Sequence, residues 1–347
     1  MVIATAACKR PSKVPFDESE NRKSAVEREM SAVEAPQKCC AVVIPTKNAG
    51  ALFQRVMDGL RRQTIWSDID LVVVDSGSTD RTIEIATAAG ARVQTIAPDT
   101  FNHGQTRDYG ISLTNAPFVL LMVQDAIPAN DMVVESLLNA VQEPGIAGAY
   151  ARQIPQENAD VLIKRNLNNW LTGRVQRETR SIENLSAYLA LPPMERFLFC
   201  NFDNVCSIIR RSAWDEEKFT RLSFGEDIDW AERVLKRGLK IVYEPAAAVI
   251  HSHDRPISYE YKRTYVCHRK LYRQFGLRLI GRRKDVLRSW FLSLASDVKF
   301  VLANEPNRYA RIKLILRLPL LTLASVYGQY RGALDEIRGA TNKVRGV

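Results

Sequence analysis

The stretch DLVVVDSGSTD, residues 70–80, is decisive for the fold because it is a short, β-branched apolar run that ends on polar residues. Two other segments have the same form, AVVIPTKN at residues 41–48 and FVLLMVQDA at residues 118–126. Apolar runs of this length, separated by helical patterns, are typical of parallel strands that are buried on both faces. The three segments predict an α/β fold with a Rossmann-like, mostly parallel sheet flanked by helices.

Polar side chains follow the ends of these predicted strands. Thr46 and Asn48 follow the first strand, Asp75 ends the second, and Asp125 follows the third. Ligands of open α/β sheets bind outside the carboxyl ends of the strands, so we expect the four side chains to face one crevice. The pattern predicts a nucleotide site.

Composition divides the chain into three parts. Residues 1–38 are polar, mixed in charge and without a sustained apolar period, which predicts a flexible tail. Residues 39–275 carry the strand patterns and predict the α/β domain, with a polar insertion at residues 153–196. Residues 276–347 predict a helical extension that is basic and amphipathic. Helices of the α/β domain are expected at residues 50–62, 80–89 and 132–141 and after His103.

Charge and cysteine content narrow the class of protein. The 347 residues carry a formal charge of +10, and residues 261–288 hold ten Lys and Arg against one acid. The six cysteines show no CxxC spacing, which favours reduced thiols in a cytosolic protein. No apolar run reaches the roughly 18 residues needed to span a bilayer. We therefore expect a cytoplasmic protein that is soluble or peripheral to a membrane.

The stretch FGEDIDWAERVLKRG, residues 224–238, places Glu226 and Asp227 after a glycine at the start of an amphipathic helix. A carboxylate in such a position can act as a general base. The alternative is that both acids are helix N-terminal charges, which the macrodipole favours.

Three more motifs supply polar groups. FNHGQTRDYG, residues 101–110, offers His103 and Arg107, and its glycine permits close backbone approach. QDA, residues 124–126, contains Asp125, which either binds a cation or caps the following helix. His251 and His253 follow the apolar run AAAVI, and alternate strand positions point to the same face.

Taken together, the ordered motifs VVIPTKN, VVVDSGSTD, FNHGQTRDYG, QDA and GEDIDWAERVLKRG followed by HSH resemble those of family 2 inverting glycosyltransferases. The resemblance is greatest to rhamnosyltransferase-type members and covers about residues 39–275. It implies a GT-A fold and transfer of a sugar from a nucleotide-diphosphate donor to a saccharide acceptor.

The resemblance also implies roles for particular residues. Asp227 would be the general base, and Glu226 would orient the acceptor or a neighbouring group. Asp75 would accept a hydrogen bond from the N3 hydrogen of uracil or thymine, although the DSGSTD segment also fits a turn or helix cap. The other residues expected to bind the donor nucleotide are Pro45, Thr46, Asn48, Ser76, Arg107 and Gln124.

A divalent cation, Mg²⁺ or Mn²⁺, is implied at Asp125 with His251 or His253. Val123 replaces the first Asp of the family's DxD motif and Ser76 the second Asp of its DDGS pattern, which predicts a weaker, more substrate-dependent metal site. Trp230 and His103 are the candidates for the acceptor site, with core packing the alternative for Trp230 and a structural role the alternative for His103.

The best single expectation is transfer of L-rhamnose from dTDP-L-rhamnose to a surface polysaccharide, whose acceptor could be lipid-linked. The basic and apolar C-terminal helices could then lie on an anionic membrane, or they could pack on the catalytic domain. The alternatives are another UDP- or GDP-sugar as donor, or a basic nucleic-acid-binding protein, although no recognised nucleic-acid-binding motif is present. No GxGxxG follows the first strand, which argues against a nicotinamide-dependent oxidoreductase.

Overall fold

The computed structural model describes residues 38–340. The predicted N-terminal tail, apart from Lys38, and residues 341–347 of the predicted extension lie outside the described residues. The three decisive segments form strands β1 (Cys40–Thr46), β2 (Ile69–Asp75) and β4 (Phe118–Met122). The helices expected between and after them are α2 (Gly50–Arg61), α3 (Thr82–Ala88), α4 (His103–Ser112) and α5 (Val133–Gln142).

Within the described residues, nine strands form one mixed sheet in the order β3-β2-β1-β4-β8-β6-β9-β5, with β7 paired to β9. Strands β3, β2, β1 and β4 are mutually parallel, which confirms the Rossmann-like half. Strand β8 is antiparallel to both β4 and β6, whereas β6 and β9 are parallel to each other. The remaining strands are β3 (Arg92–Thr95), β5 (Ile127–Pro128), β6 (Ile146–Ile154), β7 (Glu178–Ser181), β8 (Cys206–Arg210) and β9 (Lys240–Ile250).

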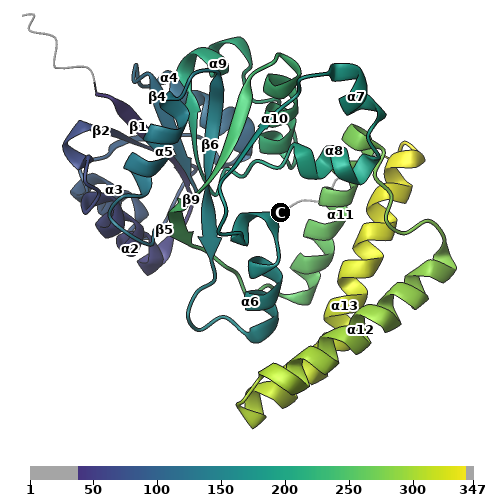
Figure 1. The fold of residues 1–347 in the computed structure, drawn as a ribbon. Coiled ribbons are helices and arrows are strands. Elements are labelled where there is room, and N and C mark those ends of the chain that lie inside the picture. The colour runs from purple at the N-terminus through teal and green to yellow at the C-terminus, as the bar shows by residue number, and fades with distance from the viewer. Residues whose placement is uncertain (1–37, 341–347) are drawn as a thin grey trace, which may run out of the picture. The chain divides into compact units, whose positions relative to one another are not determined.

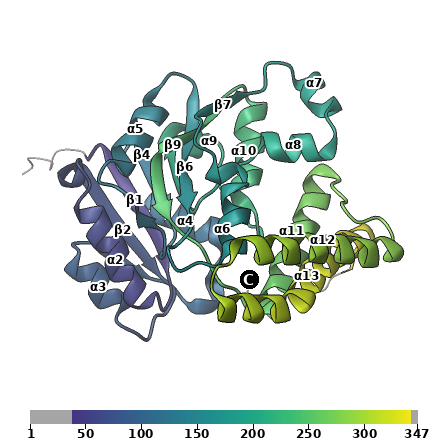
Figure 2. The same cartoon turned by 60° about the horizontal axis from the view of Figure 1, so that its bottom comes forward.

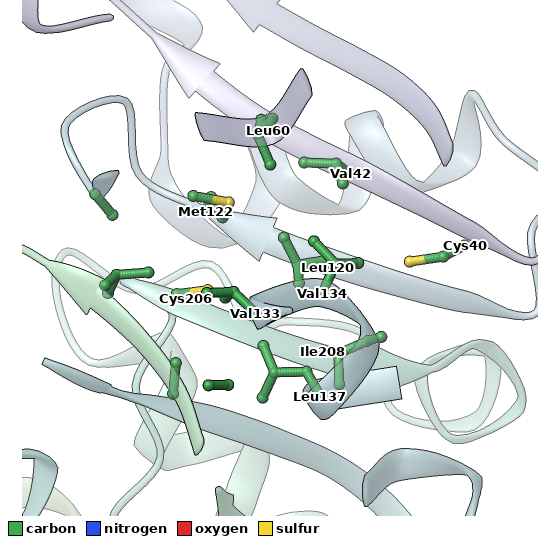
Figure 3. Close-up of a cluster of buried hydrophobic side chains, with 14 of the residues drawn as sticks. Cys40, Val42, Leu60, Leu120, Met122, Val133, Val134, Leu137, Cys206 and Ile208 are labelled. Carbon is green, nitrogen blue, oxygen red and sulfur yellow. The ribbon is translucent and has the colours of Figure 1, made fainter. Parts of the chain in front are cut away.

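The core lies on both faces of this sheet, because successive side chains of a strand point to opposite sides. Cys40, Val42 and Ile44 pack with α2 and α5, whereas Ala41 and Val43 pack against α4 and the later helices. Figure 3 shows the first of these clusters, in which side chains of α2 and α5 lie over β1, β4 and β8. Both faces being covered explains why the strand sequences read as continuous apolar runs.

The polar insertion is not a structureless loop. It contains helices α6 (Val161–Asn168), α7 (Leu185–Ala190) and α8 (Pro193–Phe199) together with strand β7. Beyond it, α9 (Arg211–Glu216) follows β8, and α10 (Glu226–Lys236) carries the predicted carboxylates. Three short 3-10 helices complete the α/β part: Trp66–Asp68, Pro98–Thr100 and Leu171–Gly173.

Helices α11 (Ile257–Phe275), α12 (Arg283–Asn304) and α13 (Arg308–Ile337) follow the sheet, and α13 packs along both α11 and α12 (Figures 1 and 2). The predicted boundary at residue 275 is the last residue of α11. Among the described residues, no helix is both long enough and apolar enough to cross a membrane.

Part of the basic patch predicted at residues 261–288 is paired within the protein. Arg269 and Arg273 pair with Glu336 of α13, and Lys270 pairs with Asp229 of α10 at 3.0 Å. These three cations join α11 to α13 and to α10, so they are not a free basic surface. The expected solvent-facing patch is therefore smaller than the sequence indicated.

Candidate active site

A cavity of about 370 Å³ lies at the carboxyl ends of β1 and β4. Of the four side chains expected to face one crevice, Thr46 and Asp125 line this cavity, whereas Asn48 and Asp75 are not among its lining residues. The predicted residues that line the cavity are Pro45, Thr46, Ser76, His103, Arg107, Gln124 and Asp125.

The turn after β2 is held by Asp75. Its buried carboxylate accepts hydrogen bonds from Thr46 Oγ1 at 3.0 Å, from Ser78 Oγ at 2.5 Å, and from the amides of Gly77 and Ser78 at 2.9 and 2.8 Å. The structure thus shows the turn-forming role for Asp75, and contact with a nucleotide base remains a prediction. Asn48, which has a φ of 46°, supports the same turn by accepting from the amide of Thr79 at 2.8 Å.

Gln124 joins the ends of β1 and β4. Its Oε1 accepts from the amide of Lys47 at 2.7 Å, and its Nε2 donates to the carbonyl of Lys47 at 3.2 Å. Both polar atoms of the amide are therefore used to fix the cavity wall, which positions the exposed Lys47 on the lining.

Asp125, His251 and His253 form one cluster, whose potential ligand atoms all lie within 4.8 Å of one another. The Nε2 atoms of His251 and His253 lie 3.6 Å from opposite oxygens of the Asp125 carboxylate. Burial lowers the pKa of His251 to about 4 and lowers that of His253, so both rings are neutral near pH 7. Neutral imidazole and ionised carboxylate are the forms that bind a divalent cation, and the cluster fits one.

A second cluster contains three carboxylates around one guanidinium. Arg107 of α4 and Glu226 of α10 form a buried ion pair, with side chains 4% and 7% exposed. Asp227 lies next to this pair, and burial, then Glu226 and then Asp203, raise the pKa of Asp227 to about 8. Burial also raises the pKa of Asp203. Burial and the two neighbouring acids therefore favour the protonated form of Asp227 near neutral pH.

Two glycines allow α4 and α10 to meet at this cluster. A Cβ at Gly104 would lie 2.9 Å from the carbonyl oxygen of Thr220 and 3.4 Å from the Cβ of Glu226. Gly225 begins α10 with a φ of 72°, in the left-handed region that favours glycine. The close approach of the two helices places Arg107 against Glu226. The first turn of α10 carries three acids, and the helix dipole favours negative charge at this end.

Comparison with known proteins identifies the family. Residues 41–217 match the model of glycosyl transferase family 2, which is about half of the chain. The chain belongs to glycosyl transferase family 2. Within this family 2 transferase the matched residues include Asp125 and Asp203, whereas Asp227, His251 and His253 follow the matched segment.

Curated relatives and solved structures agree with this assignment. The O-antigen chain rhamnosyltransferases RfbN of Salmonella typhimurium and WbaN of Salmonella anatum are 29% and 28% identical to the family 2 transferase described here. Each alignment covers 76% of this chain and 82% of the relative. The mannosyltransferase PcManGT of Pyrobaculum calidifontis, solved with GDP-Man and Mn²⁺, has a TM-score of 0.54 at 14% identity, over 92% of this chain and 95% of that one. This likeness shows the GT-A fold.

Trp230 of the family 2 transferase lies in the core, which corrects its prediction as an acceptor contact. Its side chain is completely buried, packs against the rings of Phe202 and Phe219, and donates through Nε1 to the carbonyl of Glu217 at 2.8 Å. A ring with no exposed surface cannot stack on a sugar. His103, by contrast, lies on the cavity lining against Phe101, on the side of the predicted donor residues.

Glu226 was expected to orient the acceptor or a neighbouring group, and in the structure it contacts a neighbouring group. In the family 2 transferase Glu226 is paired with Arg107, and Arg107 also lines the cavity. The pair supports Asp227 and the cavity wall.

Four further residues of the site were missed by sequence reasoning: Asp203, Gln153, Lys47 and Tyr259. Asp203 precedes β8, and a parallel β8 would place it at the opposite edge of the sheet. Because β8 of the family 2 transferase is antiparallel to β4, its first residues lie beside the last residues of β4, with the Val123 amide 3.1 Å from the Val205 carbonyl. No sequence signal gave this strand direction.

Proposed function

We propose that this family 2 glycosyltransferase is an inverting, divalent-cation-dependent rhamnosyltransferase that uses dTDP-L-rhamnose and extends a surface polysaccharide. One observation carries the proposal: Arg107 lines the cavity that contains Asp125 and, on its other side, pairs with Glu226 beside Asp227. Arg107 therefore connects two parts of the proposed site. One part is the cation site for the diphosphate, and the other is the base with the raised pKa. The names of the curated rhamnosyltransferase relatives support the choice of sugar.

In the proposed reaction Asp227 is the general base. Its Oδ1 accepts from the amide of Ile228 at 2.8 Å, whereas Oδ2 has a weaker contact with the amide of Asn204 at 3.4 Å. Oδ2 is therefore the atom proposed to take the proton of the acceptor hydroxyl. As that proton leaves, the hydroxyl oxygen bonds to the anomeric carbon, the bond from this carbon to the donor diphosphate breaks, and the configuration inverts.

Asp125, His251 and His253 would hold the divalent cation. When bound, the cation neutralises charge on the leaving diphosphate. The residues of the chain orient the other end of the donor: Thr46, Ser76 and Gln124 line the cavity on the side where the nucleoside would lie. The exposed ammonium of Lys47 adds positive charge there.

The test is thermal stabilisation of the full chain by dTDP-rhamnose, UDP-sugars, GDP-mannose, NADH and DNA, each with and without Mn²⁺. A ligand that binds the native state alone raises the melting temperature by mass action. We expect a Mn²⁺-dependent shift with dTDP-rhamnose, followed by release of dTDP when a rhamnose-accepting saccharide is added. A shift with another nucleotide sugar alone would replace the donor, and a shift with DNA but with no nucleotide sugar would overturn the proposal.

We further propose that the acceptor is lipid-linked and that α13 lies on the cytoplasmic face of an anionic membrane. Tyr309, Ile312, Leu316 and Leu320 follow helical spacing on one face of α13 and are 79%, 50%, 76% and 60% exposed. Soluble surfaces rarely expose such a stripe, and exposed lysine and arginine at the same end of the helix suit anionic headgroups. These exposed cations, which would contact the anionic membrane, are Arg308 and Lys313.

Sedimentation with vesicles tests this second proposal. The full chain should bind phosphatidylglycerol-containing vesicles more than neutral ones, and added salt should weaken the binding. The double variant Leu316→Ser/Leu320→Ser should lose about tenfold or more in partitioning, since each buried CH₂ contributes about 0.8 kcal/mol. The matched control Leu185→Ser/Leu189→Ser changes two leucines of α7 with 46% and 51% exposure and should leave partitioning unchanged. Equal loss in both variants would exclude α13 as the binding face.

A further inference from the structure

Gln153 lies between the two clusters of the site, although it was not predicted to act there. It is 7% exposed and is the last but one residue of β6. In the parallel pairing of β6 with β9, Gln153 is opposite Val249, and His251 lies two residues further along. Residues two apart on a strand point to the same face, so the sheet register brings the side chains of Gln153 and His251 together.

Both ends of the Gln153 amide are hydrogen-bonded. Nε2 donates to Asp203 Oδ2 at 2.5 Å, and Oε1 lies 3.0 Å from His251 Nδ1. Asp203 belongs to the acid cluster that raises the pKa of Asp227, and His251 belongs to the cluster with Asp125. A single side chain therefore links the proposed cation site to the proposed base.

The chemistry of the three groups fixes which atom carries each hydrogen. Asp203 accepts from the amide of Val205 through Oδ1 and from the NH₂ group of Gln153 through Oδ2, so the NH₂ group of Gln153 faces Asp203. The carbonyl oxygen of Gln153 then faces His251 and only accepts, which requires a hydrogen on Nδ1 of His251. A neutral ring with hydrogen on Nδ1 has its lone pair on Nε2, and Nε2 is the atom that faces Asp125 at 3.6 Å.

Building on the proposed cation-dependent transfer, we infer that Gln153 is a positioning residue that holds His251 in the tautomer whose Nε2 can bind the cation. Asp203 fixes the direction of the Gln153 amide, so a carboxylate of the acid cluster sets the state of a ligand in the other cluster. Groups that hydrogen-bond the second nitrogen of a ligand histidine fix its ring orientation and its tautomer. A glutamine that merely filled the core would leave the tautomer of His251 unaffected.

The first experiment reads the tautomer directly, in the absence of any metal. Nitrogen-15 NMR of the histidine-labelled full chain distinguishes a protonated from an unprotonated ring nitrogen, and a His251→Asn variant assigns the resonance among the four histidines. We expect hydrogen on Nδ1 of His251 in the wild type and a mixture of tautomers in Gln153→Leu. Hydrogen on Nε2 of His251 in the wild type would overturn the inference.

The second experiment measures the Mn²⁺ affinity of the same variants by calorimetric titration. Loss of a partner of this kind typically lowers metal affinity by about 10- to 100-fold, and we expect this loss for Gln153→Leu. Gln153→Glu keeps an acceptor for the Nδ1 hydrogen but loses the donor to Asp203, so it should recover only part of the affinity. The matched control is Gln63→Leu, which removes an equally buried glutamine that binds the carbonyls of Gly59 and Asn130 and should change stability alone.

The outcomes separate the two proposals. Wild-type protein that binds no Mn²⁺, either alone or with dTDP present, would refute the proposed cation dependence, while the NMR result would still decide the tautomer. Normal Mn²⁺ affinity in Gln153→Leu, together with an unchanged His251 resonance, would show that Gln153 is structural.

Discussion

The two ends of the site use opposite electrostatic arrangements. At one end a single carboxylate, Asp125, faces two imidazoles whose pKa values are lowered by burial, and the Asp125 side chain keeps 26% exposure. At the other end three carboxylates gather around the guanidinium of Arg107, where the side chains of Arg107 and Glu226 are less than one-tenth exposed. The first end has one acidic group and is accessible, whereas the second has more acidic groups than basic ones and is buried.

This difference shows what each end is suited to do. Neutral ligands around one carboxylate repel a cation little and leave room for it, so affinity can depend on the substrate that arrives with it. Carboxylates that repel each other in a buried place hold protons more tightly, which gives a base whose pKa is near the working pH. The contrast can be broken from either end by single substitutions.

The largest expected effect follows from removing the base. Asp227→Asn should lower the transfer rate by about 10²- to 10⁴-fold, the usual contribution of general base catalysis, while Mn²⁺-dependent donor stabilisation persists. The control Asp229→Asn, on the same helix, breaks the ion pair with Lys270 but should retain transfer. Rapid transfer by Asp227→Asn, in an assay that resolves a tenfold change, would assign the proton to another group.

The cation end should respond in binding first. Asp125→Asn removes the only carboxylate of its cluster and should weaken Mn²⁺ binding by at least about 100-fold, the upper end of the effect seen for supporting residues. Calorimetric titration measures this, and the donor-dependent thermal shift should disappear with it. Asp131→Asn, an exposed aspartate with 58% side-chain exposure, is the charge-matched control. Unchanged Mn²⁺ affinity in Asp125→Asn would remove this cluster from the proposal.

The ion pair at the acid end should be visible in stability. Arg107→Leu leaves Glu226 buried without a partner and should lower the free energy of unfolding by about 3–5 kcal/mol. The double variant Arg107→Leu/Glu226→Leu removes both charges and should lose less than the single variant. Urea unfolding measures both values. A double variant as unstable as the sum of its two single variants would mean that the pair does not act as a unit.

The smallest effect concerns pH. The pKa of Asp227 rises from its ordinary value of 3.8 to about 8, so the folded state binds this proton more tightly than the unfolded chain does. The stabilising contribution is complete below the ordinary pKa and is lost as pH rises towards 8, by at most about 1.4 kcal/mol per pH unit for one proton.

Glu226, Asp203 and Arg107 are the charged groups that act on Asp227 in this range. Transfer should increase with pH across the same range, as Asp227 becomes able to accept a proton. In metal-free urea unfolding at several pH values, Asp227→Asn should show a shallower decline in stability than the wild type. Equal slopes for the two proteins would indicate that Asp227 is already ionised at pH 5.

The sequence predicted one end of the site better than the other. The β-branched runs fixed the parallel strands, and the polar residues that follow them, such as Thr46 and Gln124, line the cavity as expected. Asp203 was missed because its place depends on the antiparallel direction of β8, which no local pattern encodes. Trp230 was misjudged because a helix pattern gives a side chain's face but not what covers that face.

The family resemblance joined residues that local patterns could not. It named Asp227, His251 and His253. The positions of the two histidines relative to Asp125 depend on long-range pairing of β9 with β5 and β6. It did not give the Arg107–Glu226 pair, because Arg107 was matched to the donor nucleotide and Glu226 to the acceptor or an unnamed neighbouring group. Motifs match residues to ligands, and they say little about which residues of the protein pair with one another.

Arg317 of α13 has a consequence for the order in which the site is completed during synthesis. It donates to Asp254 Oδ1 at 2.6 Å and to the carbonyl of Arg255, so it holds the segment that follows His253. Arg317 comes 63 residues after Asp254 along the chain. The sheet and the residues of both clusters therefore leave the ribosome before the side chain that steadies the histidine segment, and the nascent transferase acquires this restraint among its last contacts.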